Sequence, residues 1–243
     1  MQLSAACLLR RVLPVLCAVG LTGCPVRPPG SPTALEPAHA AVHVGTPYAI
    51  QAAESVLMIR AYKGGTLAAA GHNHIIASHE LSGTIYVSAD VLKTSFEVHV
   101  PVVTLSVDEH DLRLQQASAD FPPDVPDSAK EGTRRNMLGA ALLDADDYPE
   151  IVLSAVRVED TPSAGTVLVR IQALVRGTPH EFSVPVRYER SAATVTASGE
   201  TALRQSDLGL KPFSALLGAL QVQDEMRISF HIVAHADITA PQR

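Results

Sequence analysis

Apolar and polar residues alternate one by one through several stretches of this 243-residue chain. Successive side chains of an extended strand point to opposite faces, so a period of two places one apolar set on a single buried face. The alternation is clearest at 95–102, 167–176, 182–189 and 226–235, and weaker at 55–62, 73–77, 83–88, 151–158 and 194–202. Short polar or glycine- and proline-containing turns separate these stretches, and no helices alternate with them. The sequence therefore predicts an all-β fold, an antiparallel barrel or sandwich.

Two segments depart from this alternation. Met137, Leu138 and Leu142 follow helical spacing, which predicts a short helix over 130–143. A second short helix is expected over 213–220. The expected fold is thus a β-structure with one or two short helices.

The first 24 residues are organised like an export signal. Two arginines precede the apolar run 12–21, which is shorter than the roughly 20 residues that a membrane-spanning helix needs. The run ends in Leu21-Thr22-Gly23-Cys24, which resembles the lipobox of bacterial lipoproteins, where the cysteine is lipidated and becomes the new N-terminus. The alternative is an ordinary secretory signal, with Cys24 incidental.

The rest of the chain divides into a tether and a domain. Residues 25–47 are rich in proline and predict an extended tether, and residues 48–238 predict a single β-domain after the signal peptide 1–24. We expect a periplasmic protein of the cell envelope, anchored by its lipid. Pro25 follows the cysteine where an aspartate commonly retains lipoproteins at the inner membrane, which favours the outer membrane.

Charge and motifs exclude several functions. The formal net charge is −6 and no dense lysine or arginine run occurs, so nucleic acid is not an expected partner. The sequence has no Gly-x-Ser-x-Gly elbow and no glycine-rich phosphate loop, so neither catalysis nor a cofactor is expected.

Histidine is the residue type that stands out, with ten copies. His72 and His74 lie two residues apart, so on a strand both imidazoles would face one side and could bind a metal. A third ligand could come from His79, His110, His180, His231 or His235. The alternative is that these imidazoles lie at a barrel mouth, bonded to backbone or water.

The inward side chains of the clearest strands are aliphatic. The chain has no Trp and only 4% aromatic residues, whereas sugar sites usually offer aromatic platforms, so the interior suits lipid tails. The residues expected to line a ligand cavity are Phe96, Val98, Val100, Val169, Ile171, Phe182, Val184, Ile228 and Phe230. Alternation alone favours a filled core instead, and a register error of one residue would invert any strand.

Five sets of residues, in chain order, carry a family resemblance. They are Gly71-His72-Asn73-His74 with 81–85, Thr104-Leu105-Ser106-Val107-Asp108, Asp147-Tyr148-Pro149-Glu150-Ile151, 172–186 with Arg176-Gly177-Thr178-Pro179-His180, and Arg204-Gln205-Ser206-Asp207-Leu208-Gly209. Together they resemble the YceI-like family of bacterial secreted proteins over about residues 55 to 235.

The resemblance implies a lipocalin-like antiparallel β-barrel of about eight strands, with a hydrophobic channel for a long isoprenoid or quinone-like chain. It favours a ligand cavity over a filled core. Two departures concern the family's Arg-Asp-x-His-Leu stretch and its paired phenylalanines, where this chain has Arg134-Arg135-Asn136-Met137-Leu138 and Leu142-Leu143. The family's way of recognising a ligand head group therefore cannot be transferred to this chain. The alternatives are a metal-binding envelope protein using His72 and His74, or a structural or stress protein without a ligand.

Overall fold

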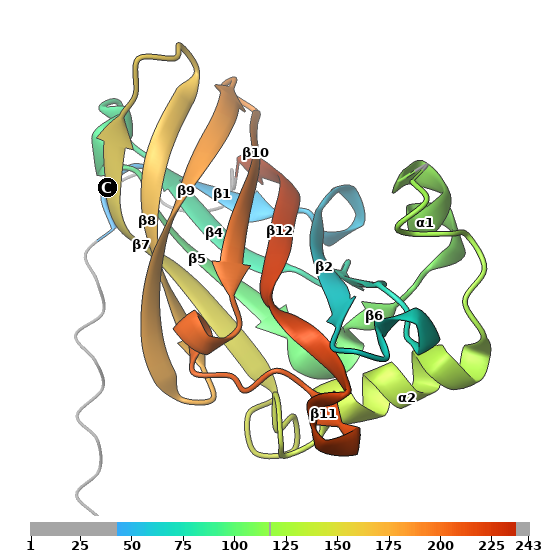
Figure 1. Ribbon diagram of the computed structural model, residues 1–243. Helices are drawn as coiled ribbons and strands as arrows, with labels where there is room; N and C mark the ends of the chain where they lie inside the picture. Colours follow the sequence, from blue (N-terminus) through green and yellow to red (C-terminus); the bar gives the residue numbers. More distant parts are fainter. Residues whose placement is uncertain (1–42, 117, 237–243) are drawn as a thin grey trace, which may run out of the picture. The chain divides into compact units, whose positions relative to one another are not determined.

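The computed structural model describes residues 43–116 and 118–236. Within them, eight antiparallel strands close into a barrel (Figure 1). In order around the barrel they are β1 (Thr46–Ile50), β4 (Ser82–Val87), β5 (Ser95–Pro101), β7 (Glu150–Asp160), β8 (Thr166–Val175), β9 (Thr178–Arg190), β10 (Thr194–Arg204) and β12 (Leu220–Ala236). The barrel closes because β1 pairs with both β4 and β12. The predicted fold class is confirmed.

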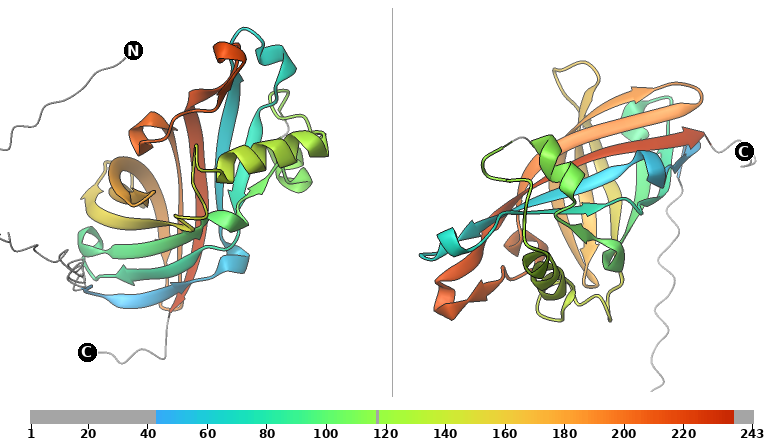
Figure 2. Two further views of the ribbon diagram at one scale, coloured as in Figure 1. Left: turned by 90° about the horizontal axis from the view of Figure 1, so that it is seen from below. Right: turned by 90° about the vertical axis from the view of Figure 1, so that its right-hand side faces the viewer.

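The long strand β12 belongs both to the closed barrel and to a sheet that leaves it. Its last residues pair with β1, whereas residues 221–231 pair with β2 (Val56–Gly64). Strand β2 pairs in turn with β3 (His74–Ser78), and β3 pairs with β6 (Ser106–Val107). At this end the wall splays outward, as both views of Figure 2 show.

Two helices pack against the splayed sheet. In α2 (Asp127–Leu138), Arg134 donates hydrogen bonds to the backbone oxygens of Val103 and Leu105, beside β6. The other helix, α1 (His110–Gln116), buries Leu112 with Ile75 and Phe121. None of the helices in the described ranges is long and apolar enough to span a bilayer.

The prediction of a helix over 213–220 is wrong. No pattern in the sequence indicated helix α1. The segment instead contains the short strand β11 (Ser214–Ala215) and one 3₁₀ turn, because Leu216 and Leu217 adopt left-handed backbone angles that no α-helix accepts. The 3₁₀ turns are η1 (Ala52–Glu54), η2 (Ala68–Ala70), η3 (Val91–Lys93), η4 (Val102–Thr104), η5 (Ser206–Leu208) and η6 (Leu216–Gly218).

The folded domain begins earlier than residue 48. Strand β1 starts at Thr46, and before it His43 stacks on Tyr86 with ring centroids 4.0 Å apart and bonds Ser95 Oγ across 2.9 Å. The predicted signal peptide 1–24, most of the tether and Cys24 lie outside the described residues.

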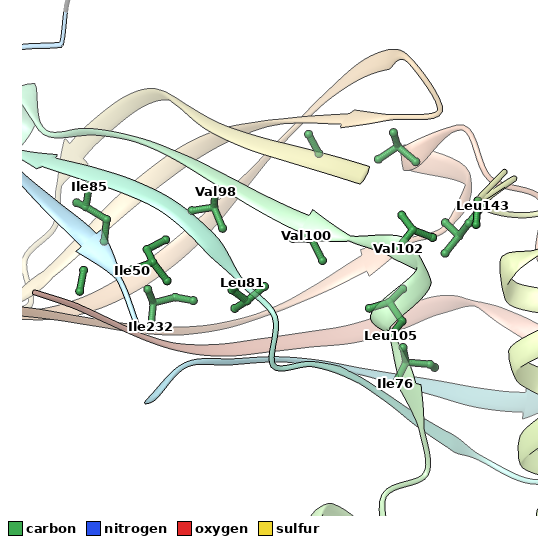
Figure 3. Close-up of a cluster of buried hydrophobic side chains, with 14 of the residues drawn as sticks. Ile50, Ile76, Leu81, Ile85, Val98, Val100, Val102, Leu105, Leu143 and Ile232 are labelled. Carbon is green, nitrogen blue, oxygen red and sulfur yellow. The ribbon is translucent and has the colours of Figure 1, made fainter. Parts of the chain in front are cut away.

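The core follows the alternation read from the sequence. In β8, Val167, Val169 and Ile171 are buried while Arg170 is exposed. Figure 3 shows the same arrangement on β4, β5 and β12, where Ile85, Val98 and Ile232 lie in one apolar cluster in the barrel interior. Apolar side chains from these strands thus line the interior of the closed end.

Candidate ligand cavity

The barrel contains two adjoining cavities, of about 160 Å³ and about 510 Å³. The smaller lies in the closed part of the barrel and is lined almost wholly by apolar atoms. The larger extends under α2 and the splayed sheet. The side chains that line both are Leu57, Val100, Leu153, Phe182 and Ile228. Because these side chains are shared, the two cavities lie next to each other along the barrel interior.

Several large side chains point inward without being fully buried. Phe96, Leu153 and Phe230 line the smaller cavity and keep accessible surface, although they belong to the apolar interior. In a filled core such side chains would be covered on every side, since protein interiors pack densely. Their remaining surface faces the cavity.

Gly199 allows the Phe230 ring to lie close to the wall. The two residues are paired across β10 and β12, and a Cβ on Gly199 would come within 2.8 Å of the ring's Cζ. It would also come within 2.8 Å of the Pro185 carbonyl oxygen. Only glycine leaves room for so close an approach, which keeps the ring against the strands.

All nine residues expected from alternation line the smaller cavity, and Val100, Phe182 and Ile228 also line the larger one. That they contact a ligand remains a prediction. Sequence reasoning missed the part of the larger cavity formed by β2, β3 and α2, which includes Ala61 and Thr133. The helical spacing of Met137 and Leu142 predicted a helix in this region, but not that it lines a cavity.

A buried polar network lies beside the larger cavity. His74 Nδ1 is 2.6 Å from Asp108 Oδ2, and His74 Nε2 is 3.0 Å from Thr133 Oγ1 of α2. The other oxygen, Asp108 Oδ1, accepts hydrogen bonds from Arg113 Nη1 at 2.5 Å and from the Ile75 backbone N–H at 2.8 Å. The network connects β3, α1 and α2, so it fixes the imidazole at the cavity wall.

The carboxylate of Asp108 remains ionised in this network. Burial alone raises its pKa, but the hydrogen bonds from His74 and the Ile75 amide, together with the charges of His74 and Arg113, bring the pKa below the ordinary value of 3.8. The Arg113 charge is therefore matched by an adjacent negative charge inside the protein.

The two histidines predicted to bind metal both line the larger cavity, with ring centroids 6.2 Å apart. Both ring nitrogens of His74 are already engaged, by Asp108 and Thr133. Within the described ranges, no three His, Cys, Asp or Glu side chains gather as a metal site would require. Metal binding by His72 and His74 stays a prediction that this geometry does not favour.

The comparison with family models identifies the family of this chain. A model described as "YceI-like domain" matches residues 36–234. The fold is similar to the crystal structure of Burkholderia cenocepacia BcnA, with a TM-score of 0.56 and 16% identity, covering 76% of this chain and 99% of that one. The Campylobacter jejuni YCEI protein gives a TM-score of 0.46 and 8% identity, covering 65% of this chain and 82% of that one. No curated protein matches the sequence. The chain belongs to the YceI-like family.

Proposed function

We propose that this protein binds an elongated apolar molecule, such as an isoprenoid or quinone-like chain, and is a carrier or binding protein, not an enzyme. The observation that supports this most strongly is the largely apolar lining of the two adjoining cavities. Each methylene group removed from water into such a space contributes roughly 0.8 kcal/mol. A flexible hydrocarbon is therefore the class of ligand that gains most from this interior.

The distribution of polar groups suggests how the ligand lies. Lys63, His72, His74, Thr133 and Asn136 line the larger cavity, whereas almost no polar surface faces the smaller one. A polar head group would find hydrogen-bond partners in the larger cavity, and the tail would extend past Leu153 into the smaller one.

The test is organic extraction of the purified full chain, followed by mass spectrometry of the extract. We expect a co-purifying apolar chain in roughly equimolar amount. The Leu153→Trp variant should lose most of it, because Leu153 lines both cavities and a larger side chain narrows their junction. Leu174→Trp is the matched control, since Leu174 faces outward on neighbouring β8 and is 40% exposed. Extracts without an apolar molecule, or equal loss in both variants, would contradict the proposal.

We also propose that the protein is an envelope lipoprotein, anchored through Cys24 and facing the periplasm, with the outer membrane as its site. The signal-like segment and the Leu-x-Gly-Cys ending support this. In a bacterial host, a radiolabelled fatty acid should enter the wild-type chain and not Cys24→Ser. If both forms incorporate label equally, Cys24 is not the lipidation site.

A further inference from the structure

Two loops lie side by side at the splayed end of the barrel. One is the tip of the β2–β3 hairpin, residues 64–71, and the other is the segment 212–220 that contains β11 and η6. The backbone N–H of Leu67 donates to the carbonyl oxygen of Ala219 at 2.7 Å. Both views of Figure 2 show them protruding together from the same end. We call these two loops the apolar tip.

The apolar tip exposes large hydrophobic side chains. Leu216 is 67% exposed, Leu217 is completely exposed, and Leu67 on the neighbouring loop is 46% exposed. Neither loop contains a charged residue, although 18% of the chain is charged. Three exposed leucines on one small protrusion are the pattern of a surface that binds something apolar.

Cations flank the apolar tip. Lys63 directly precedes the first loop and Lys211 directly precedes the second. The Lys63 ammonium donates to the backbone oxygen of Gly71 at 3.1 Å, so it is held at the base of the first loop, and Lys211 is exposed. An uncharged tip with ammonium groups at its base complements a bilayer, whose hydrocarbon lies beneath anionic head groups.

The backbone presents the leucines at a conformational cost. Leu216 and Leu217 have φ angles of 51° and 55°, in the left-handed region that residues other than glycine rarely adopt. In water their side chains gain little that offsets this cost, because both are largely exposed. Inserting the two leucine side chains into an apolar phase outside the protein would bury them and offset this cost.

The apolar tip also borders the larger cavity. Phe213 and Leu220 from the second loop, and Ala70 and Gly71 from the first, are among its lining residues. A bilayer against this end would bring hydrocarbon next to the cavity. An apolar ligand could then pass between membrane and barrel without crossing water.

We propose that the apolar tip docks onto a lipid bilayer containing anionic lipids, with Leu67, Leu216 and Leu217 entering its outer hydrocarbon layer and with Lys63 and Lys211 at the head groups. The ligand-transfer part of this inference rests on the proposed carrier function. The docking itself does not, and it is separate from any anchor at Cys24.

The chain contains no Trp, so a single introduced indole reports on one position. The full chain with Leu217→Trp is mixed with vesicles of phosphatidylethanolamine and phosphatidylglycerol, with or without brominated acyl chains. We expect a blue shift of the emission and quenching by the brominated chains. Leu174→Trp, on the outer barrel wall, should show neither, even if the N-terminal segment holds the protein on the vesicle.

Two further variants test the chemistry of docking. Replacing both Leu216 and Leu217 by Asp should weaken vesicle partitioning by about tenfold or more, because two carboxylates replace two inserted side chains. Lys211→Gln should weaken partitioning only when phosphatidylglycerol is present.

Equal quenching at positions 217 and 174, or none at 217, would overturn the docking proposal. So would a blue shift that appears without lipid and grows with protein concentration, since that result assigns the apolar tip to self-association. These outcomes are distinguishable from a failure of the carrier function, because extraction of a co-purifying ligand does not depend on vesicle binding.

Discussion

Arg113 Nη1 donates to Asp108 Oδ1 across 2.5 Å, and both side chains are completely shielded from solvent. A buried ion pair contributes little net stability over an apolar pair, but removing one partner leaves an uncompensated charge. Because Asp108 also contacts His74 at the cavity wall, this pair positions part of the candidate site.

We predict that Asp108→Asn lowers the free energy of unfolding by about 3–5 kcal/mol, since it strands the Arg113 charge and weakens the contact to His74. Asp111→Asn, at an exposed position on α1, is the control and should change stability by no more than about 0.5 kcal/mol. Urea unfolding of both variants measures the difference. Equal values would mean that the buried pair has no special role.

Gly199→Ala should disturb the smaller cavity. The new Cβ would overlap both the Phe230 ring and the Pro185 carbonyl oxygen, so the ring must move inward and the strands must shift. We expect a loss of about 1–3 kcal/mol of stability and a lower ligand content in extracts. The double variant Gly199→Ala, Phe230→Leu should recover part of the ligand content, because it removes the ring. No change in either quantity would show that the wall tolerates a side chain there.

Stability should depend on the protonation of His99. Its Nε2 lies 3.0 Å from Glu97 Oε1 and its Nδ1 lies 3.1 Å from Glu150 Oε1. Burial alone lowers the pKa of His99, but hydrogen bonds and charge from the two carboxylates raise it above 6.5 overall.

The folded state therefore holds this proton more tightly than the unfolded state. The resulting stabilisation is fully present below pH 6.5 and is lost as the pH rises through the raised pKa. Relative to His99→Gln, the wild type should lose stability across that range, and NMR titration should place the His99 pKa above its ordinary value. Parallel stability curves for the two proteins would contradict this.

Leu217→Gly should separate stability from membrane docking. Glycine accepts the left-handed backbone without the steric cost of a Cβ, so stability should rise by about 0.5–1 kcal/mol after allowing for glycine's greater unfolded entropy. Partitioning into vesicles should fall, because an inserted side chain is lost. Leu174→Gly, within β8, should instead lower stability. A Leu217→Gly variant that is less stable than the wild type would show that the backbone there is not strained.

The sequence predicted the barrel walls well because strand alternation is a local property. Val169 and Ile171 could be placed inward from their neighbours alone. The larger cavity could not be predicted, because Thr133 and His74 meet only once α2 packs against β3. Nor could the apolar tip, since the spacing of apolar residues over 213–220 suggested a helix, whereas Leu216 and Leu217 take left-handed angles.

A crystal structure of the full chain, purified from a bacterial host, would show whether a single elongated ligand occupies both cavities. We predict continuous elongated electron density that begins near His74 in the larger cavity and runs past Leu153 into the smaller one. Side chains packed together at that junction, with no density and no passage between the two cavities, would contradict the account.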